Sequence, residues 1–95
     1  MAVCMVFSPP KSFYTKETYA KVMELLGETF PPPSMSLHVM GANDEGDIRI
    51  VDIFESAEAF EEFAASHAPV YEEMGIGVED LMQYVSLFEV ERTIK

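Results

Sequence analysis

The sequence predicts an α+β domain whose elements follow the order βαββαβ. Three observations lead to this order. Two runs of β-branched and aromatic residues, 37–40 and 48–54, are separated by turn-forming residues. Apolar residues recur at helical spacing after Thr15 and again after Ser56, and short apolar runs lie near both ends of the chain. Strands and helices joined by short connections indicate one domain over residues 1–95.

The first strand and the first helix are predicted in the opening thirty residues. The run 2–7 is apolar, too short for a helix and ended by a Ser-Pro-Pro sequence, so it reads as a strand buried on both faces. Thr15 is suited to be the N-cap of a helix that closes near Gly27. Tyr19, Val22, Met23 and Leu26 share one side of this helix, which is usually core packing; Tyr19 could also present its hydroxyl to a pocket.

The hairpin in the middle of the chain can form in two registers. If Gly46 is the left-handed residue of a three-residue loop with a bulge, His38 lies opposite Asp52; a two- or four-residue loop puts His38 opposite Val51. We favour the first register. Side chains alternate between the faces of a strand, so one face then carries His38, Met40, Ile50, Asp52 and Phe54, and the other carries Val51 and Ile53.

The second half of the chain predicts a helix and a last strand. Ser56 caps the helix, Pro69 interrupts it, and a further turn or two over 70–74 ends at Gly75. Residues 76–80 are predicted to be a loop, and 84–90 to be the last strand. The whole is the ferredoxin-like arrangement, a four-stranded antiparallel sheet with two helices on one face. The other face carries Val51 and Ile53, so we expect a second copy of the chain to cover it in a homodimer.

Charge and cysteine content exclude several classes of function. Six Lys and Arg against seventeen Asp and Glu give a net charge of −11, which argues against binding to nucleic acid or to an anionic membrane. The single cysteine, Cys4, excludes an internal disulfide and a cysteine-based zinc site. No signal peptide or membrane span is visible, so we expect a cytoplasmic protein.

Few residues could carry chemistry. His38 and Asp52, if they are cross-strand neighbours, make an oriented imidazole suited to general base work; the alternative is a hydrogen-bonded pair that only satisfies two polar groups. His67 precedes Pro69 and is expected to be exposed or to cap the helix, and Tyr71 follows four residues later. The two histidines have no metal-ligand spacing around them, so no metal site is predicted.

Three segments resemble small proteins of the dimeric α/β barrel superfamily, and within it the antibiotic-biosynthesis-monooxygenase-like members. They are HVMG at 38–41, GDIRIVDIFES at 46–56, and EAF at 58–60 followed by Phe63. The resemblance implies a cavity between sheet and helices and chemistry without a cofactor. Phe54 stands where the family pattern has a tryptophan. Phe63 stands at or next to the position of an iron-binding histidine in haem-degrading relatives, which argues against haem.

Two functions remain in view. The first is a cofactor-independent monooxygenase or cyclase that acts on a small apolar aromatic or polyketide-like molecule. In this hypothesis His38 is the proton acceptor and Asp52 its orienting partner, and the substrate-binding residues are Phe54, Met40, Tyr19, Met23 and Tyr71. The second is a non-catalytic dimeric module that binds a ligand or simply assembles. The feature that separates them is whether His38 and Asp52 reach an open cavity.

Overall fold

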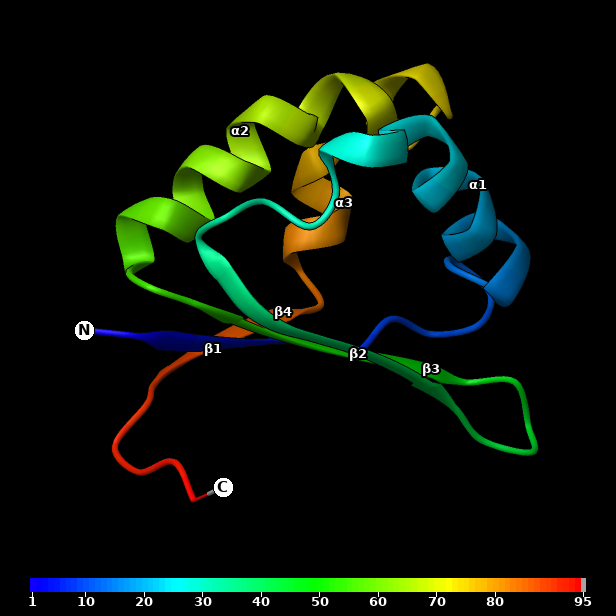
Figure 1. Ribbon diagram of the computed structural model, residues 1–95. Coiled ribbons are helices and arrows are strands. Elements are labelled where there is room, and N and C mark those ends of the chain that lie inside the picture. Colours follow the sequence, from blue (N-terminus) through cyan, green and yellow to red (C-terminus); the bar gives the residue numbers. More distant parts are fainter. Residues whose placement is uncertain (95) are drawn as a thin grey trace.

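Four antiparallel strands form one sheet in a computed structural model that describes residues 1–94. The strands are β1 (Val3–Phe7), β2 (Met35–Ala42), β3 (Ile48–Phe54) and β4 (Val85–Glu89), in the spatial order β2-β3-β1-β4. Two longer helices, α1 (Lys16–Leu26) and α2 (Ala57–Glu73), cover one face of the sheet (Figure 1). This is the predicted ferredoxin-like fold, with a short 3₁₀ helix η1 (Gly27–Thr29) and a short helix α3 (Val78–Met82) added.

Both long helices begin where the capping residues predict. The Thr15 side chain accepts a hydrogen bond from the backbone N–H of Thr18, and the Thr18 side chain accepts one from the backbone N–H of Thr15. Ser56 accepts from the backbone N–H of Ala59 in the same way. Gly27 follows the last residue of α1 with φ = 58°, a conformation that glycine adopts at little cost. These local contacts fix the start of each helix above the sheet.

The hairpin adopts the favoured register. Gly46 has φ = 90°, and the backbone N–H of Asn43 donates to the carbonyl of Asp47. His38 therefore pairs with Asp52 across β2 and β3. The alternation of burial along β3 follows the pleat, since Ile48, Ile50, Asp52 and Phe54 are buried beneath the helices.

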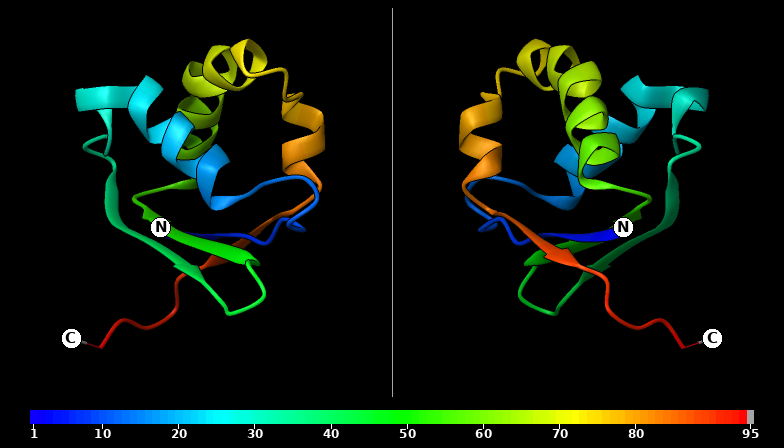
Figure 2. Two further views of the ribbon diagram at one scale, coloured as in Figure 1. Left: turned by 90° about the vertical axis from the view of Figure 1, so that its right-hand side faces the viewer. Right: turned by 90° about the vertical axis from the view of Figure 1, so that its left-hand side faces the viewer.

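The two faces of the sheet have different surroundings. The inner face and the helices enclose the core, in which Phe54 and Ile48 are fully buried. All helices lie on this side, while the C-terminal segment runs away on the other side (Figure 2). The outer face leaves apolar side chains accessible, since Leu37 and Val39 are each 48% exposed and Phe88 is 58% exposed. None of the helices in residues 1–94 has the length and apolar character needed to cross a bilayer.

Two predictions about the second half of the chain are wrong. Pro69 does not interrupt α2, which continues to Glu73. Proline removes one helical hydrogen bond, but Pro69 and Ala65, the residue whose carbonyl loses its donor, are both exposed, so water can replace the bond. Residues 76–80 are not all loop, because α3 starts at Val78 directly after Gly77. Leu81 anchors this short helix by burial in the core, a tertiary contact with no local signal.

Candidate functional site

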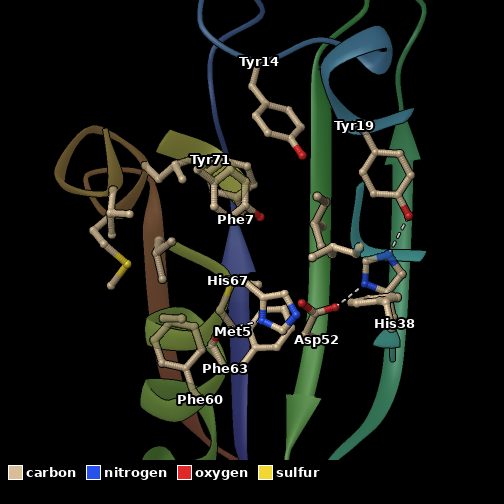
Figure 3. Close-up of a pocket in the computed structure, with 18 of the residues that line it drawn as sticks. Met5, Phe7, Tyr14, Tyr19, His38, Asp52, Phe60, Phe63, His67 and Tyr71 are labelled. Atoms are coloured by element: carbon tan, nitrogen blue, oxygen red, sulfur yellow. Dashed lines mark hydrogen bonds and ion pairs between the residues drawn. The ribbon is translucent and has the colours of Figure 1, made fainter. Parts of the chain in front are cut away.

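A mostly apolar cavity of about 90 Å³ lies between the inner face of the sheet and the helices (Figure 3). Its walls come from the sheet, from α1, α2 and α3, and from the segment before α1. A single water needs only about 10–15 Å³ of such space, so the cavity has room for a small organic molecule. Six residues supply its polar groups: Tyr14, Tyr19, His38, Asp52, and the α2 residues His67 and Tyr71.

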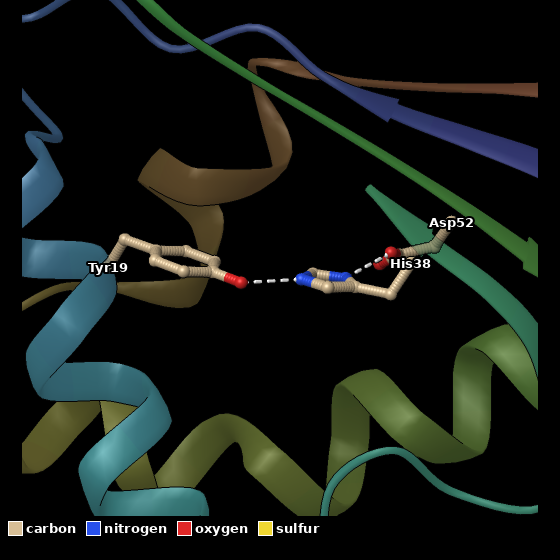
Figure 4. Close-up of polar contacts among 3 residues, drawn as sticks. All are labelled: Tyr19, His38 and Asp52. Carbon is tan, nitrogen blue, oxygen red and sulfur yellow. Dashed lines mark hydrogen bonds and ion pairs between the residues drawn. The ribbon is translucent and has the colours of Figure 1, made fainter. Parts of the chain in front are cut away.

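Three of these side chains form a continuous hydrogen-bonded row (Figure 4). The Tyr19 hydroxyl lies 2.7 Å from Nε2 of His38, and Nδ1 of His38 lies 2.5 Å from Oδ1 of Asp52. With Asp52 ionised, Nδ1–H donates to the carboxylate and the Tyr19 O–H donates to Nε2. The row therefore runs from a phenol on α1, through an imidazole on β2, to a carboxylate on β3.

Aromatic neighbours hold the imidazole in place. The rings of Tyr19 and His38 are within 5° of parallel, and the edge of Phe30 meets the His38 ring at a centroid distance of 4.8 Å. The His38 side chain is 18% exposed and the Asp52 side chain 4%. Water therefore has little access to the pair, and a proton arriving at Nε2 would be stabilised by the nearby carboxylate.

Burial dominates the electrostatics of the site. Burial raises the pKa of the Asp52 carboxyl above its ordinary value, although the hydrogen bond from His38 and the charge of His38 act in the opposite direction. Burial and the Asp52 charge raise the pKa of the Tyr71 phenol to about 12. Burial, together with Tyr71 and Tyr19, also raises the pKa of Tyr14. The tyrosines lining the cavity thus carry their protons near neutral pH.

His67 lies in the wall of the cavity. Its Nδ1 is 2.8 Å from the backbone carbonyl of Phe63, one helical turn earlier. A carbonyl can only accept, so Nδ1 carries the proton and Nε2 of the neutral ring is left as an acceptor. Phe63 and His67 line the cavity and also a second, more open groove between α2 and the segment at Pro32. These two side chains therefore separate the cavity from that groove.

The structure brings together most of the predicted site residues, but not all of them. His38, Asp52, Tyr19, Met23 and Tyr71 line the cavity. Phe54 and Met40 do not, and the expectation that they form its wall is wrong. Phe54 is fully buried between Phe60 and Phe63, with ring centroids at 5.5 and 5.3 Å. Met40 lies on the edge strand β2, which lines the cavity only at His38.

Tyr14 is the site residue that sequence reasoning missed. It immediately precedes the N-cap Thr15, the position from which an apolar side chain often packs against the fourth helical residue. That residue is Tyr19, so the capping pattern was a usable signal that Tyr14 points inward beside it. The cavity walls contributed by Phe30 and by α3 had no comparable signal.

Within residues 1–94, no group of three or more His, Cys, Asp or Glu side chains is arranged to hold a metal ion. The polar groups of the cavity are instead phenols, imidazoles and one carboxylate. Such a set can move a proton, orient a hydroxyl or carbonyl group, and present apolar walls to a ring system.

Comparison with known proteins adds to the description of the fold. No family model matches the chain, and no curated protein matches it in sequence. Among solved structures, the chain is similar to Rv0793 from Mycobacterium tuberculosis, with a TM-score of 0.63 and 16% sequence identity over 99% of this chain and 97% of that one. At this identity the likeness shows the fold alone.

Proposed function

We propose that the protein is a dimeric α/β barrel enzyme of the cofactor-independent monooxygenase or cyclase type. Its substrate is a small, mostly apolar aromatic or polyketide-like molecule that binds in the cavity between sheet and helices. The observation that carries the proposal is the row of Tyr19, His38 and Asp52 in the wall of a mostly apolar cavity between sheet and helices. The sequence resemblance to antibiotic-biosynthesis-monooxygenase-like proteins supports the same reaction class.

In this proposal the row removes a proton from the substrate. An acidic O–H or C–H of the substrate lies against the Tyr19 oxygen and passes its proton there as the Tyr19 proton moves to Nε2 of His38. His38 becomes an imidazolium, which the Asp52 carboxylate stabilises through Nδ1. The substrate anion is then electron-rich enough to react with O₂, in a monooxygenase, or to attack a carbonyl carbon of its own chain, in a cyclase.

The second copy in this proposal covers the outer face of the sheet. Leu37 and Val39 are about half exposed there and pair with the partly buried Ile53 and Val51, and the exposed Phe88 lies on β4, across β1 from Ile53. Exposed apolar side chains gathered on one sheet face are typical of an interface, and a two-fold axis lets the same patch bury itself. The helices lie on the opposite face of the sheet (Figure 2), and the cavity lies between them and the sheet, so both remain outside this interface.

A binding screen followed by an oxygen-uptake assay tests the function. Aromatic quinols, anthrones and polyketide mimics are first ranked by thermal shift, because a ligand that binds only the native state raises the melting temperature. The best binders are then incubated with the protein in an oxygen electrode. We expect wild-type protein to consume O₂ or to form a cyclised product. His38→Ala should lose this turnover and keep its fold. The control Tyr84→Phe changes a residue outside the cavity and should keep the turnover.

The alternative is a dimeric module that binds a ligand without changing it. One observation favours this alternative: Tyr19 already occupies Nε2 of His38, so both ring nitrogens have hydrogen-bond partners and the pair could serve stability alone. The same screen separates the two functions. Thermal shifts without turnover in any compound, or a His38→Ala variant that unfolds, would favour the non-catalytic module.

A further inference from the structure

Two phenol groups in the cavity have no role in the row formed by Tyr19, His38 and Asp52. Tyr14 is 2% exposed, and the edge-to-face contact with Phe7, at a centroid distance of 5.1 Å, fixes the position of its ring. Tyr71 reaches the same cavity from α2. Figure 3 shows both hydroxyls directed into the space between the helices and the sheet, without a hydrogen bond to the residues drawn.

The Tyr14 hydroxyl faces the cavity and has no hydrogen bond to another described side chain. Within residues 1–94, no fully enclosed side-chain nitrogen or oxygen lacks a hydrogen-bond partner. The Tyr14 hydroxyl has no partner among these residues, so it is in contact with the open space of the cavity. Phenylalanine would fill the same ring volume, so what the hydroxyl adds is a polar group that faces the cavity. The hydroxyl is therefore better explained by a ligand that accepts its hydrogen bond.

The neighbouring charges limit what that ligand can be. The charge of an ionised Tyr71 raises the pKa of Tyr14, and the Asp52 charge raises the pKa of Tyr71, so the three groups lie near one another around the cavity. Both phenols keep their protons near neutral pH, so they act as donors. The Asp52 carboxylate repels a permanent anion such as a carboxylate or phosphate. A neutral acceptor, above all a carbonyl oxygen, fits two O–H donors beside an apolar wall.

We propose that Tyr14 and Tyr71 form a donor pair that binds a carbonyl oxygen of the ligand. The inference rests on the proposed function and specifies its substrate class: a planar conjugated molecule with a hydroxyl at one edge and a carbonyl at the other. The hydroxyl meets Tyr19, and the carbonyl meets Tyr14 and Tyr71. When the hydroxyl loses its proton, conjugation moves negative charge to the carbonyl oxygen, where the two donors stabilise it.

Two bicyclic probes that differ only in the carbonyl test the proposal. The first, 6-hydroxy-1-tetralone, has a hydroxyl conjugated with a ketone; the second, 5,6,7,8-tetrahydro-2-naphthol, has the same rings and hydroxyl but no ketone. Their affinities are measured by calorimetry with wild-type protein, Tyr14→Phe, Tyr71→Phe and the control Tyr84→Phe. Tyr84 is a half-buried tyrosine outside the cavity, so its variant reports the general effect of losing a hydroxyl.

We expect wild-type protein and Tyr84→Phe to bind the ketone about tenfold more tightly than the naphthol, as one or two good hydrogen bonds imply. Tyr14→Phe and Tyr71→Phe should each lose most of this preference and bind the naphthol unchanged. Tyr14→Phe should also melt no lower than wild type, because it removes an unpaired hydroxyl. A lower melting temperature would mean that the hydroxyl supports the fold instead.

The outcomes separate this inference from the proposed function. Equal affinity of wild-type protein for the two probes, or a preference that survives in Tyr14→Phe and Tyr71→Phe, overturns the donor pair while leaving proton removal by the Tyr19 row intact. A carbonyl preference that depends on Tyr14, without turnover of any substrate, supports the donor pair and counts against the enzyme. If wild-type protein binds neither probe, the donor pair fails, and the screen of quinols, anthrones and polyketide mimics decides the proposed function separately.

Discussion

Removal of His38 and Asp52, singly and together, measures how strongly the two side chains depend on each other. The Nδ1 and Oδ1 atoms are 2.5 Å apart, and the two side chains are only 18% and 4% exposed, so solvent screens their interaction weakly. A hydrogen bond to a charged group contributes about 1.5–3 kcal/mol to stability. We therefore expect the double-mutant cycle of His38→Ala and Asp52→Ala to give a coupling free energy of about 1.5–3 kcal/mol at pH 7.

The single variants are less informative than the coupling. Asp52→Ala loses the partner of His38 but also removes a carboxylate whose burial is unfavourable, as its raised pKa indicates. These two effects oppose each other, and only the cycle isolates the interaction.

The assay is urea unfolding followed by circular dichroism at one protein concentration, because a dimer makes stability depend on concentration. A control cycle of Asp52→Ala with Tyr84→Phe should be additive within about 0.5 kcal/mol. A coupling below about 0.5 kcal/mol for His38 and Asp52 would refute the claim that they act as a unit.

Four further predictions concern stability, assembly and pH. Phe54→Ala should lower the free energy of unfolding by about 3–5 kcal/mol, since the ring is fully buried; a loss below about 1 kcal/mol in urea unfolding would contradict its place in the core. Phe88→Asp should convert a dimer into single chains of 10.7 kDa in light scattering, whereas wild-type protein that already measures as a single chain would remove the proposed interface. Burial raises the pKa of Asp52 above its ordinary value of 3.8, so the free energy of unfolding of wild-type protein relative to Asp52→Asn should fall as the pH rises above 3.8. A relative free energy of unfolding that rises with pH would mean that the pKa of Asp52 is lowered in the folded state. Tyr71, with its pKa raised to about 12, should contribute stability that is present below pH 10 and lost between pH 10 and about 12, so Tyr71→Phe should flatten this part of the alkaline unfolding curve.

The fold was predictable because its signals are local. Thr15 and Ser56 cap their helices through contacts within three residues, and the turn at Gly46 sets the register that places His38 opposite Asp52. Strand alternation then sends both side chains toward the helices. A pair of polar residues separated by fourteen positions could thus be placed together from the sequence.

The shape of the cavity was not predictable in the same way. Phe54 and Met40 were correctly placed on the inner face, but which inner-face residues border empty space depends on how the helices pack above them. Phe54 is covered by two rings of α2, whereas Asp52, two residues earlier, is not. The helix α2 continues past Pro69 because the turn is exposed and water can replace the lost hydrogen bond, and α3 forms because Leu81 is buried in the core; neither cause is visible in the local sequence.

The central claim is that the enclosed row of side chains takes a proton from a bound molecule. The most direct measurement is the ultraviolet absorbance of bound 6-hydroxy-1-tetralone as a function of pH, since the anion of a conjugated hydroxy-ketone absorbs at longer wavelength than the neutral form. Our account predicts that the bound compound ionises at least about one pH unit below the free compound, and that His38→Ala abolishes this difference. A bound compound that stays neutral up to its ordinary ionisation pH in wild-type protein would contradict it.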